Sequence, residues 1–319
     1  MRINKLPKTF VETYSGVCGV CRETVCGILD RMDSAEVGSP VHAYLETLEK
    51  VPETIRRHEE QGIPQEITAA TLSDLGIWSA DYYARTGTFG IDPARRQWFE
   101  LQESLRILRI GRLQYHTELR FGGKIKVFCH RATKEMCLLA ENGLAMDAGG
   151  QRTEHADFQT IYEETDSAFL GNPIETGVTL RSLSKLLRSD WEKILEYGDP
   201  LYSIHIPADG PMLLEDCLNS MREAILFFES RRPASCKGFY CHSWLLDPFL
   251  QQILPETSNI VRFQKRGTLY PVSGKSEILS RLKPSGSGGG TRFRNRVESF
   301  LFGGKTFHNG GWFMLREQL

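Results

Sequence analysis

The segment from residue 201 to residue 266 constrains the fold more than any other part of the chain. Alternating apolar and polar residues predict strands over Leu201–Ile206, Lys237–His242 and Asn259–Arg266. Apolar residues at helical spacing predict two intervening helices, one starting at Gly210-Pro211 and one over "SWLLDPFLQQILP". The order strand, helix, strand, helix, strand favours a layer of strands covered by helices.

The residue pattern changes near residue 100. Before it, apolar residues recur with the period of a helix, and breakers such as Gly38-Ser39-Pro40 separate pieces of ordinary helix length. After Trp98 the segments "LRILRIGRLQYHTELRF" and "KIKVFCH" alternate, and Gly122-Gly123 between them predicts a β-hairpin. We therefore expect an α+β fold, with a helical N-terminal domain at residues 1–100 and a mixed α/β sheet domain at residues 101–319.

Three segments of the second half are less regular. Residues 135–199 are predicted to form a loop, a short strand and a helix over Leu183–Tyr197. The glycine-rich "SGSGGGT" that begins at Ser285 lacks the Gly-Lys-Ser/Thr end of a phosphate-binding loop, so a flexible loop is predicted. Phe293–Phe302 is expected to be a helix and "KTFHNGGWFMLR" a closing strand.

Composition limits the classes of partner. The 319 residues carry a formal net charge of -1, with 40% hydrophobic and 25% charged residues. This charge gives no reason to expect nucleic acid or an anionic membrane as the main partner, whereas a small ligand fits. No apolar run approaches the roughly 20 residues needed to cross a bilayer. The first residues lack the apolar segment of a secretory signal, so a cytoplasmic location is predicted. The oligomeric state is not indicated.

Eight cysteines are expected to be reduced thiols rather than a disulfide framework. Cys18 and Cys21 form one C-x-x-C, which is compatible with half of a zinc site or a redox pair. No second C-x-x-C or paired histidine follows, and a structural zinc site needs four ligands. The helical spacing of the neighbouring apolar residues favours a buried helix face, and no metal site is predicted.

The end of the first strand carries the main candidate binding site. Alternation places His205 on the face opposite Ile204. The following turn enters a helix whose first N–H groups lack partners and can receive an anion such as a pyrophosphate. Glu215 and Asp216 in the first helical turn would repel that anion, so a strand and helix without a ligand is the alternative. The proposed binding residues are Ile206, Pro207, Ala208, Asp209, Gly210, Pro211 and Met212.

Other polar side chains lie on the neighbouring predicted strands. Tyr240 and His242 share one strand face, which Cys241 does not. Arg262 lies on a face of the third predicted strand and can either reach a ligand carboxylate or phosphate or pair with a surface acid. Asp247-Pro248 is expected to begin a helix. Upstream, a polar row on the predicted hairpin either lines a cleft or faces solvent; it consists of Arg112, Gln114 and His116.

Five short segments together carry a family resemblance: "SIHIPADGPM", "CHSWLLDP", "NIVRFQKR", "RIGRLQ" and "GGWF". With "RIGRLQ" upstream of the others and "GGWF" near the end, they resemble the bacterial family that joins a helical N-acyltransferase N-terminal domain to a GNAT-like C-terminal domain. The resemblance covers nearly the whole chain. The usual GNAT phosphate signature, Gln or Arg, two residues, Gly, one residue, then Gly or Ala, is absent from "PADGPMLLED", which has only Gly210.

The resemblance implies acetyl-CoA or another acyl-CoA as co-substrate and a small-molecule amine or hydroxyl acceptor. The pyrophosphate would lie at the turn after Pro207, and the pantetheine arm between the strands near Ile204 and Tyr240. Direct acyl transfer needs a base for the acceptor proton, and His205 and His242 are the candidates because imidazole titrates near neutrality.

Tyr240 is the candidate general acid toward the leaving thiolate. Each of the candidate catalytic residues could instead be structural. The competing function is a non-catalytic GNAT-like module that binds a small carboxylated or phosphorylated ligand.

Overall fold

The computed structural model describes residues 6–231, 236–276, 278, 288–304 and 306–319. The chain forms two compact units, each built from several sequence segments. The first unit comprises Met1–Glu118, His205–Pro211 and Glu215–Arg232, and the second comprises Leu119–Ile204, Met212–Leu214 and Pro233–Leu319.

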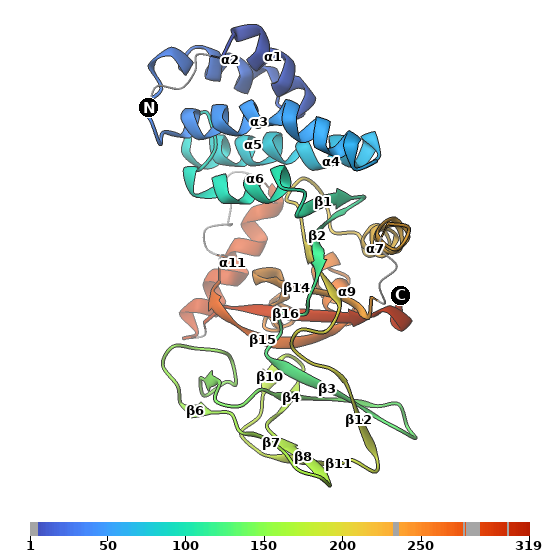
Figure 1. Cartoon of the computed structure of the whole chain (residues 1–319). Coiled ribbons are helices and arrows are strands. Elements are labelled where there is room, and N and C mark those ends of the chain that lie inside the picture. Colours follow the sequence, from blue (N-terminus) through green and yellow to red (C-terminus); the bar gives the residue numbers. More distant parts are fainter. Residues whose placement is uncertain (1–5, 232–235, 277, 279–287, 305) are drawn as a thin grey trace. The chain divides into compact units, whose positions relative to one another are not determined.

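Helices dominate the first unit, as the spacing of apolar residues predicts (Figure 1). A buried apolar cluster that includes Tyr44, Leu48 and Phe99 holds them together. The hydroxyl oxygen of Ser39 accepts the backbone N–H of His42 and caps the longest helix. The helices are α1 (Lys8–Val17), α2 (Arg22–Leu29), α3 (Pro40–Glu60), α4 (Gln65–Leu72), α5 (Asp74–Thr86) and α6 (Arg96–Glu103).

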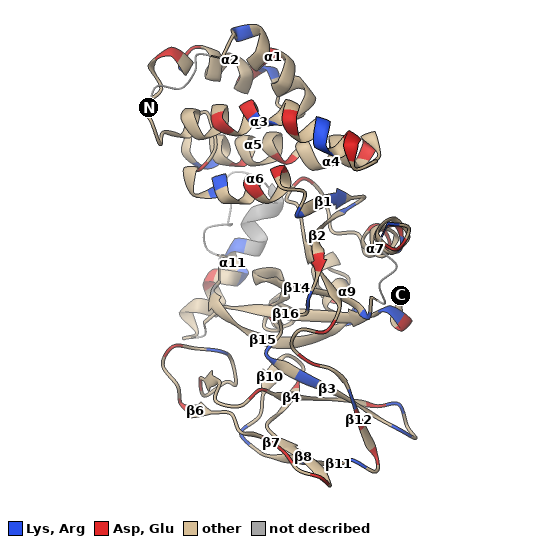
Figure 2. Ribbon diagram, viewed as in Figure 1, with Lys and Arg blue, Asp and Glu red and all other residues tan. Residues whose placement is uncertain are grey.

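Acidic and basic residues alternate along α3 (Figure 2). Glu53 pairs with both Arg56 and Arg57 one turn further on. These side chains are exposed, and such pairs on a helix surface contribute little to stability. The charged side of α3 is therefore a solvated face opposite its apolar side.

A hairpin and one long helix complete the first unit. Strands β1 (Ile107–Ile110) and β2 (Leu113–Leu119) are antiparallel, with Ile110 opposite Leu113, so Gly111-Arg112 is a two-residue turn. Gly111 has φ of +57°, which suits a tight hairpin. Helix α7 (Leu214–Glu229) packs on this hairpin: Oγ of Ser220 lies 2.7 Å from Oη of Tyr115 and accepts the backbone N–H of Leu113.

The predicted hairpin across Gly122-Gly123 is wrong. Strand β2 pairs with β1, whereas β3 (Ile125–His130) pairs with β4 (Met136–Ala140) and β12 (Trp191–Leu195). The turn residues that close a hairpin are Gly111-Arg112, which lie inside a stretch that reads as one continuous alternation. The diglycine instead carries the chain from one sheet to another.

The second unit contains a mixed sheet in which β13, β14, β16 and β15 are neighbours in that order. The β13–β14 pair is parallel, and the β14–β16 and β15–β16 pairs are antiparallel. The predicted first, second and closing strands are thereby confirmed. The bounds are β13 (Leu201–His205), β14 (Gly238–Ser243), β15 (Thr268–Lys275) and β16 (His308–Leu315).

A second sheet of the same unit has the order β10-β9-β4-β3-β12. A buried cluster that includes Phe121, Val127, Leu201, Tyr270 and Phe313 joins it to the mixed sheet. The remaining strands form a three-stranded sheet, β11-β8-β7, and the pair β5-β6. Their bounds are β5 (Ala145–Met146), β6 (Phe158–Gln159), β7 (Tyr162–Glu164), β8 (Ala168–Gly171), β9 (Pro173–Glu175), β10 (Val178–Thr179) and β11 (Ser184–Leu187).

Two predicted elements have the opposite secondary structure. The expected helix over Leu183–Tyr197 is instead two strands, β11 and β12, which pair with β8 and β3 respectively. The expected strand over Asn259–Arg266 is helix α9, with Val261, Phe263 and Gln264 buried. In α9 the apolar residues alternate with polar ones over a short stretch, which imitates a strand. Tertiary packing decides between the two states where so few residues carry the pattern.

Smaller differences concern where helices begin. Helix α7 starts at Leu214 rather than at Pro211. The helix expected after β14 is shortened to a 3-10 turn at Trp244–Leu246 and α8 (Leu250–Ile253). The expected helix over Phe293–Phe302 is part of α11 (Gly288–Phe302), while Ser285 lies outside the described residues. None of the helices in the described ranges is long and apolar enough to cross a membrane.

Candidate functional site

The candidate anion-binding turn, residues 207–211, is fastened by one arginine of the β1–β2 hairpin. Arg112 donates from Nε to the carbonyl oxygen of Pro211 at 3.0 Å. Its Nη2 donates to the carbonyl oxygens of Pro207 at 2.9 Å and Gly210 at 2.8 Å. The turn is therefore fixed by a single guanidinium through three of its carbonyls.

The acidic residue of this turn is paired. Oδ2 of Asp209 lies 2.7 Å from Nη2 of Arg109, and its Oδ1 lies 3.7 Å from Nη1 of Arg112. The two arginine side chains are about nine-tenths buried. Two guanidinium groups therefore face this carboxylate, and Asp216 in the first turn of α7 is a second negative charge that acts on Arg112. Glu215 remains exposed in the first turn of α7.

The sequence analysis assigned Arg112 to a polar row and gave Arg109 no role. The signal that could have found them is "RIGR": Arg112 follows the turn glycine directly, and Arg109 lies on β1 two residues before that glycine, so both are close to the hairpin turn. The other members of the row lie elsewhere. Gln114 is buried and His116 contacts His205.

His205, at the end of β13, lies among aromatic rings of the first unit. Its imidazole is 4.8 Å from the Trp98 ring in an edge-on arrangement and 5.0 Å from the His116 ring. Burial lowers the pKa of His116. The Trp98 indole is in turn fixed, because its Nε1 donates to Oδ2 of Asp74 at 2.5 Å.

Asp74 is a buried carboxylate that the sequence analysis missed. It is 2% exposed, and its Oδ2 also accepts the amide N–H of Gln102 at 2.7 Å. Burial raises the pKa of Asp74, although the hydrogen bonds from Trp98, Gln114 and Gln102 oppose that rise. It lies at the first position of α5, where helix spacing alone marks it as an ordinary first-turn acid.

The second unit contains a group of neutral aromatic and imidazole side chains around β14. As alternation predicts, Tyr240 and His242 share one face, and their rings are 5.4 Å apart. Nε2 of His242 lies 2.8 Å from Oη of Tyr270, which is fully buried. The phenol donates to Nε2 or accepts from it according to the imidazole tautomer. The ring of Phe121 meets Tyr240 edge-on at 5.3 Å.

The titration of this group follows from its surroundings. His242 keeps an exposed surface, yet the protein packed around its ring lowers its pKa by disfavouring the charged form. Burial raises the pKa of Tyr270 well above its ordinary value, so the phenol keeps its proton. Both residues are therefore uncharged at neutral pH. Tyr270, on β15, is a second residue that the sequence analysis missed.

The pairing between the two parallel strands of the mixed sheet ends beside Tyr240. Their pairing runs from Leu201 opposite Gly238 to Ser203 opposite Tyr240 and then stops. Both strands continue beyond that point, β13 to His205 and β14 to Ser243. The ladder therefore ends within the strands rather than at their ends.

Asp247 follows the 3-10 turn after β14, and its buried carboxylate links two backbone segments rather than capping a long helix. Its Oδ1 accepts the backbone N–H of Phe249 at 2.9 Å, and its Oδ2 accepts that of His308 at 2.6 Å. Burial raises its pKa to about 6, against the effect of these hydrogen bonds. The side-chain amide of Gln264 donates to the backbone carbonyls of Leu245 and Asp247.

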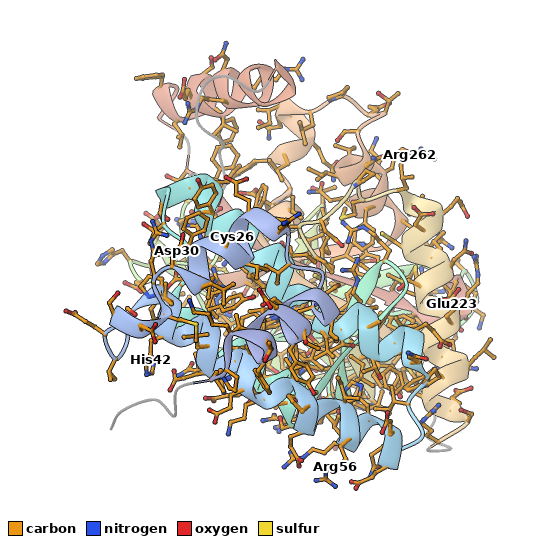
Figure 3. The ribbon with its side chains drawn as sticks, turned by 90° about the horizontal axis from the view of Figure 1, so that it is seen from above. Cys26, Asp30, His42, Arg56, Glu223 and Arg262 are labelled. Carbon is orange, nitrogen blue, oxygen red and sulfur yellow. The ribbon has the colours of Figure 1, made fainter. Side chains whose placement is uncertain are left out.

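Arg262 lies on the exposed side of α9 (Figure 3) and not on a strand. The correction follows from the helical packing of Val261 and Phe263, which face the core. Its contact with a ligand phosphate or carboxylate stays a prediction.

The cysteines are all free thiols. Cys18 is buried in the helical core, which raises its pKa to about 12, whereas Cys21 is exposed and lies 3.2 Å from Oγ1 of Thr24. Cys26 is exposed on α2 (Figure 3). Within the described ranges, no group of three or more histidine, cysteine or acidic residues is placed to hold a metal ion.

With this geometry in view, comparison with known proteins identifies the class. Residues 107–312 match the family model of the GNAT-like C-terminal domain, and residues 7–105 match that of the N-acyltransferase N-terminal domain. The chain therefore belongs to the GNAT-like C-terminal domain family, and the predicted two-domain resemblance is confirmed. No curated protein matches the chain.

Solved acyltransferase structures share the fold. One in complex with decanoyl-CoA and teicoplanin is 20% identical, with a TM-score of 0.52 over 84% of this chain and 64% of that chain. A mutant acyltransferase in complex with octanoyl-CoA is 18% identical, with a TM-score of 0.60 over 98% of this chain and 89% of that chain. The chain thus spans slightly less than two thirds of the length of the first of these relatives.

Proposed function

We propose that the protein transfers an acyl group from acyl-CoA to an amine or hydroxyl of a small-molecule acceptor. The observation that carries this proposal is that the pairing of β13 and β14 ends at Ser203 and Tyr240 while both strands continue, within a chain of the GNAT-like family. A pantetheine arm has amide groups that can pair with a strand edge exposed in this way. The related acyltransferase structures that hold acyl-CoA support the same donor class.

The chemistry would proceed by direct transfer. The acceptor nitrogen or oxygen attacks the thioester carbonyl carbon, a carbon–nitrogen or carbon–oxygen bond forms, and the carbon–sulfur bond breaks. The acceptor loses one proton to a base, and the CoA thiolate gains one from an acid. His242 suits the base because its lowered pKa leaves it neutral at pH 7. His205 is the second candidate base, and Tyr240 is the candidate acid.

The remaining assignments belong to the same proposal. The 207–211 turn would receive the pyrophosphate, with Arg262 as a further candidate contact. The helical part, residues 1–100, and the sheet part, residues 101–319, would act as two domains. A cytoplasmic location agrees with eight free thiols, which are typical of a reducing compartment.

Binding and turnover test the proposal separately. Purified protein is titrated with CoA, acetyl-CoA, octanoyl-CoA and decanoyl-CoA by calorimetry, and its melting temperature is recorded with each. A ligand at 100 times its Kd should add about 2.7 kcal/mol to the free energy of unfolding. Release of free thiol from acyl-CoA is then followed with a panel of amines that includes teicoplanin.

Each result decides between the two candidate functions. Binding together with acceptor-dependent thiol release supports the acyltransferase. Binding without release for any acceptor supports the ligand-binding module. A complete lack of binding to every CoA species contradicts the acyltransferase.

A further inference from the structure

The 207–211 turn lacks the second glycine of the usual GNAT phosphate signature, yet its backbone is held in one conformation. In the signature, glycines let the backbone turn so that its N–H groups approach a phosphate closely. Here Arg112 binds the carbonyl oxygens of Pro207, Gly210 and Pro211. The side chain of Arg112, from the β1–β2 hairpin, therefore holds the turn backbone in a conformation that glycines would reach through their own flexibility.

The direction of the carbonyls sets the direction of the amides. The C=O and N–H of one trans peptide point to opposite sides, and no cis peptide bond occurs among the described residues. Because the carbonyls of Pro207 and Pro211 point at the guanidinium, the N–H groups of Ala208 and Met212 point away from it. Neither N–H group has an acceptor in the part of the chain that the structure describes.

We propose that Arg112 is a positioning residue that orients the Ala208 and Met212 amides toward the pyrophosphate of CoA. This inference rests on the proposed function. Lysine cannot replace arginine here, because the three carbonyls are bound by two nitrogens of one rigid planar group. Arg109 supports the arrangement by pairing with Asp209 at 2.7 Å, which weakens the repulsion between that carboxylate and the phosphates.

The test compares Arg112→Ala and Arg112→Lys with a matched control on the same hairpin. Arg106 precedes β1 and makes an exposed ion pair with Glu118 at 3.9 Å, so Arg106→Ala is the control. Calorimetry measures the Kd for CoA. Steady-state kinetics compare octanoyl-CoA with octanoyl-pantetheine, which lacks the pyrophosphate. Hydrogen exchange reports the mobility of the turn amides.

Both Arg112 variants should raise the Kd for CoA by about tenfold or more. Their kcat/KM should fall for octanoyl-CoA and stay within about twofold for octanoyl-pantetheine, and the Ala208 and Met212 amides should exchange faster. Arg106→Ala should change none of these values. Because both donors are measured on the same protein, a partly unfolded variant would lose activity with both and is thereby recognised.

Two outcomes overturn the inference in distinguishable ways. If the wild-type protein binds CoA and Arg112→Lys binds it equally well, charge rather than orientation matters and the positioning role is wrong. If the two donors lose the same factor in kcat/KM, Arg112 supports the fold in general and the positioning role is again wrong. If the wild-type protein binds no CoA, the proposed function itself fails and the inference fails with it.

Discussion

Both candidate histidines contact aromatic rings, but the chain segments next to them differ in charge. In the first unit, His205 is followed by a turn whose carbonyls and acid are held by Arg112 and Arg109. In the second unit, His242 lies beside the neutral rings of Tyr240 and Tyr270, and its Nε2 is hydrogen-bonded to Oη of Tyr270. A charged surrounding binds and orients an anion, whereas a neutral one lowers the pKa of an imidazole and suits proton transfer. We therefore propose that the 207–211 turn binds the anion and that His242 is the first candidate for proton transfer.

The largest expected effect is on turnover. His242→Ala should lower kcat by about 100-fold or more, as removal of a general base does. Because the surroundings lower the pKa of His242, activity should not decline as pH falls to its ordinary value of 6.5. Steady-state kinetics from pH 5 to pH 9 check both points, with urea unfolding of the variant as control. A loss of stability as large as the loss of turnover would make His242 structural.

A substitution at Gly311, next to the ring of Tyr270, tests whether the hydrogen bond between His242 and Tyr270 depends on tight packing. A Cβ at residue 311 would overlap the ring of Tyr270, so Gly311→Ala should destabilise the fold by about 1–3 kcal/mol. It should also lower turnover by displacing the partner of His242. Gly16→Ala is the control, because nothing lies within 4 Å of the added atom. Unfolding in urea gives the comparison, and equal stabilities would show that the ring can move without cost.

The pH dependence of the free energy of unfolding tests the raised pKa of the buried Asp247 carboxyl. Asp247 is fully buried, and its folded pKa of about 6 exceeds its ordinary value of 3.8. Between these values the folded state binds more protons than the unfolded state. The free energy of unfolding should therefore fall as pH rises from 4 to 6, by about 3 kcal/mol at most. In Asp247→Asn this contribution should vanish, and unfolding curves of the two proteins with the same pH slope would contradict the assignment.

The smallest expected effect concerns Arg262. As one exposed charge on α9, it should change the Kd for CoA by about twofold at low salt, and not at all at high salt. Calorimetry of Arg262→Ala at two salt concentrations checks this. A loss of about tenfold or more would move the centre of anion binding toward α9, and away from the 207–211 turn.

The period of the apolar residues predicted the secondary structure of the long elements correctly. It failed for short segments, whose secondary structure depends on tertiary contacts. The helices of the first hundred residues are long enough for their spacing to be clear, and apolar residues alternate with polar ones around His205 on β13 and His242 on β14. The short pattern of α9 does not distinguish a helix from a strand. The candidate residues His205, Tyr240 and His242 followed from alternation, because side-chain direction on a strand is a local property.

The partners of those residues could not be predicted in the same way. The carbonyls that bind Arg112 come 95 to 99 residues later in the chain. Asp74 and Trp98 are 24 residues apart and lie on different helices. Such contacts depend on how elements pack, and a sequence pattern marks each residue as an ordinary surface or helix-end residue until that packing is known.

The first unit is built from separate stretches of the chain, and this limits where related genes can recombine without loss of folding. Residues 1–118 leave their unit incomplete, because α7 returns about a hundred positions later and brings Ser220 to the hydroxyl of Tyr115. A gene fusion or recombination event with a breakpoint near residue 118 would take Tyr115 from one parent and Ser220 from the other. Viable chimaeras should therefore carry both pieces from the same parent, and breakpoints near residue 118 should be selected against.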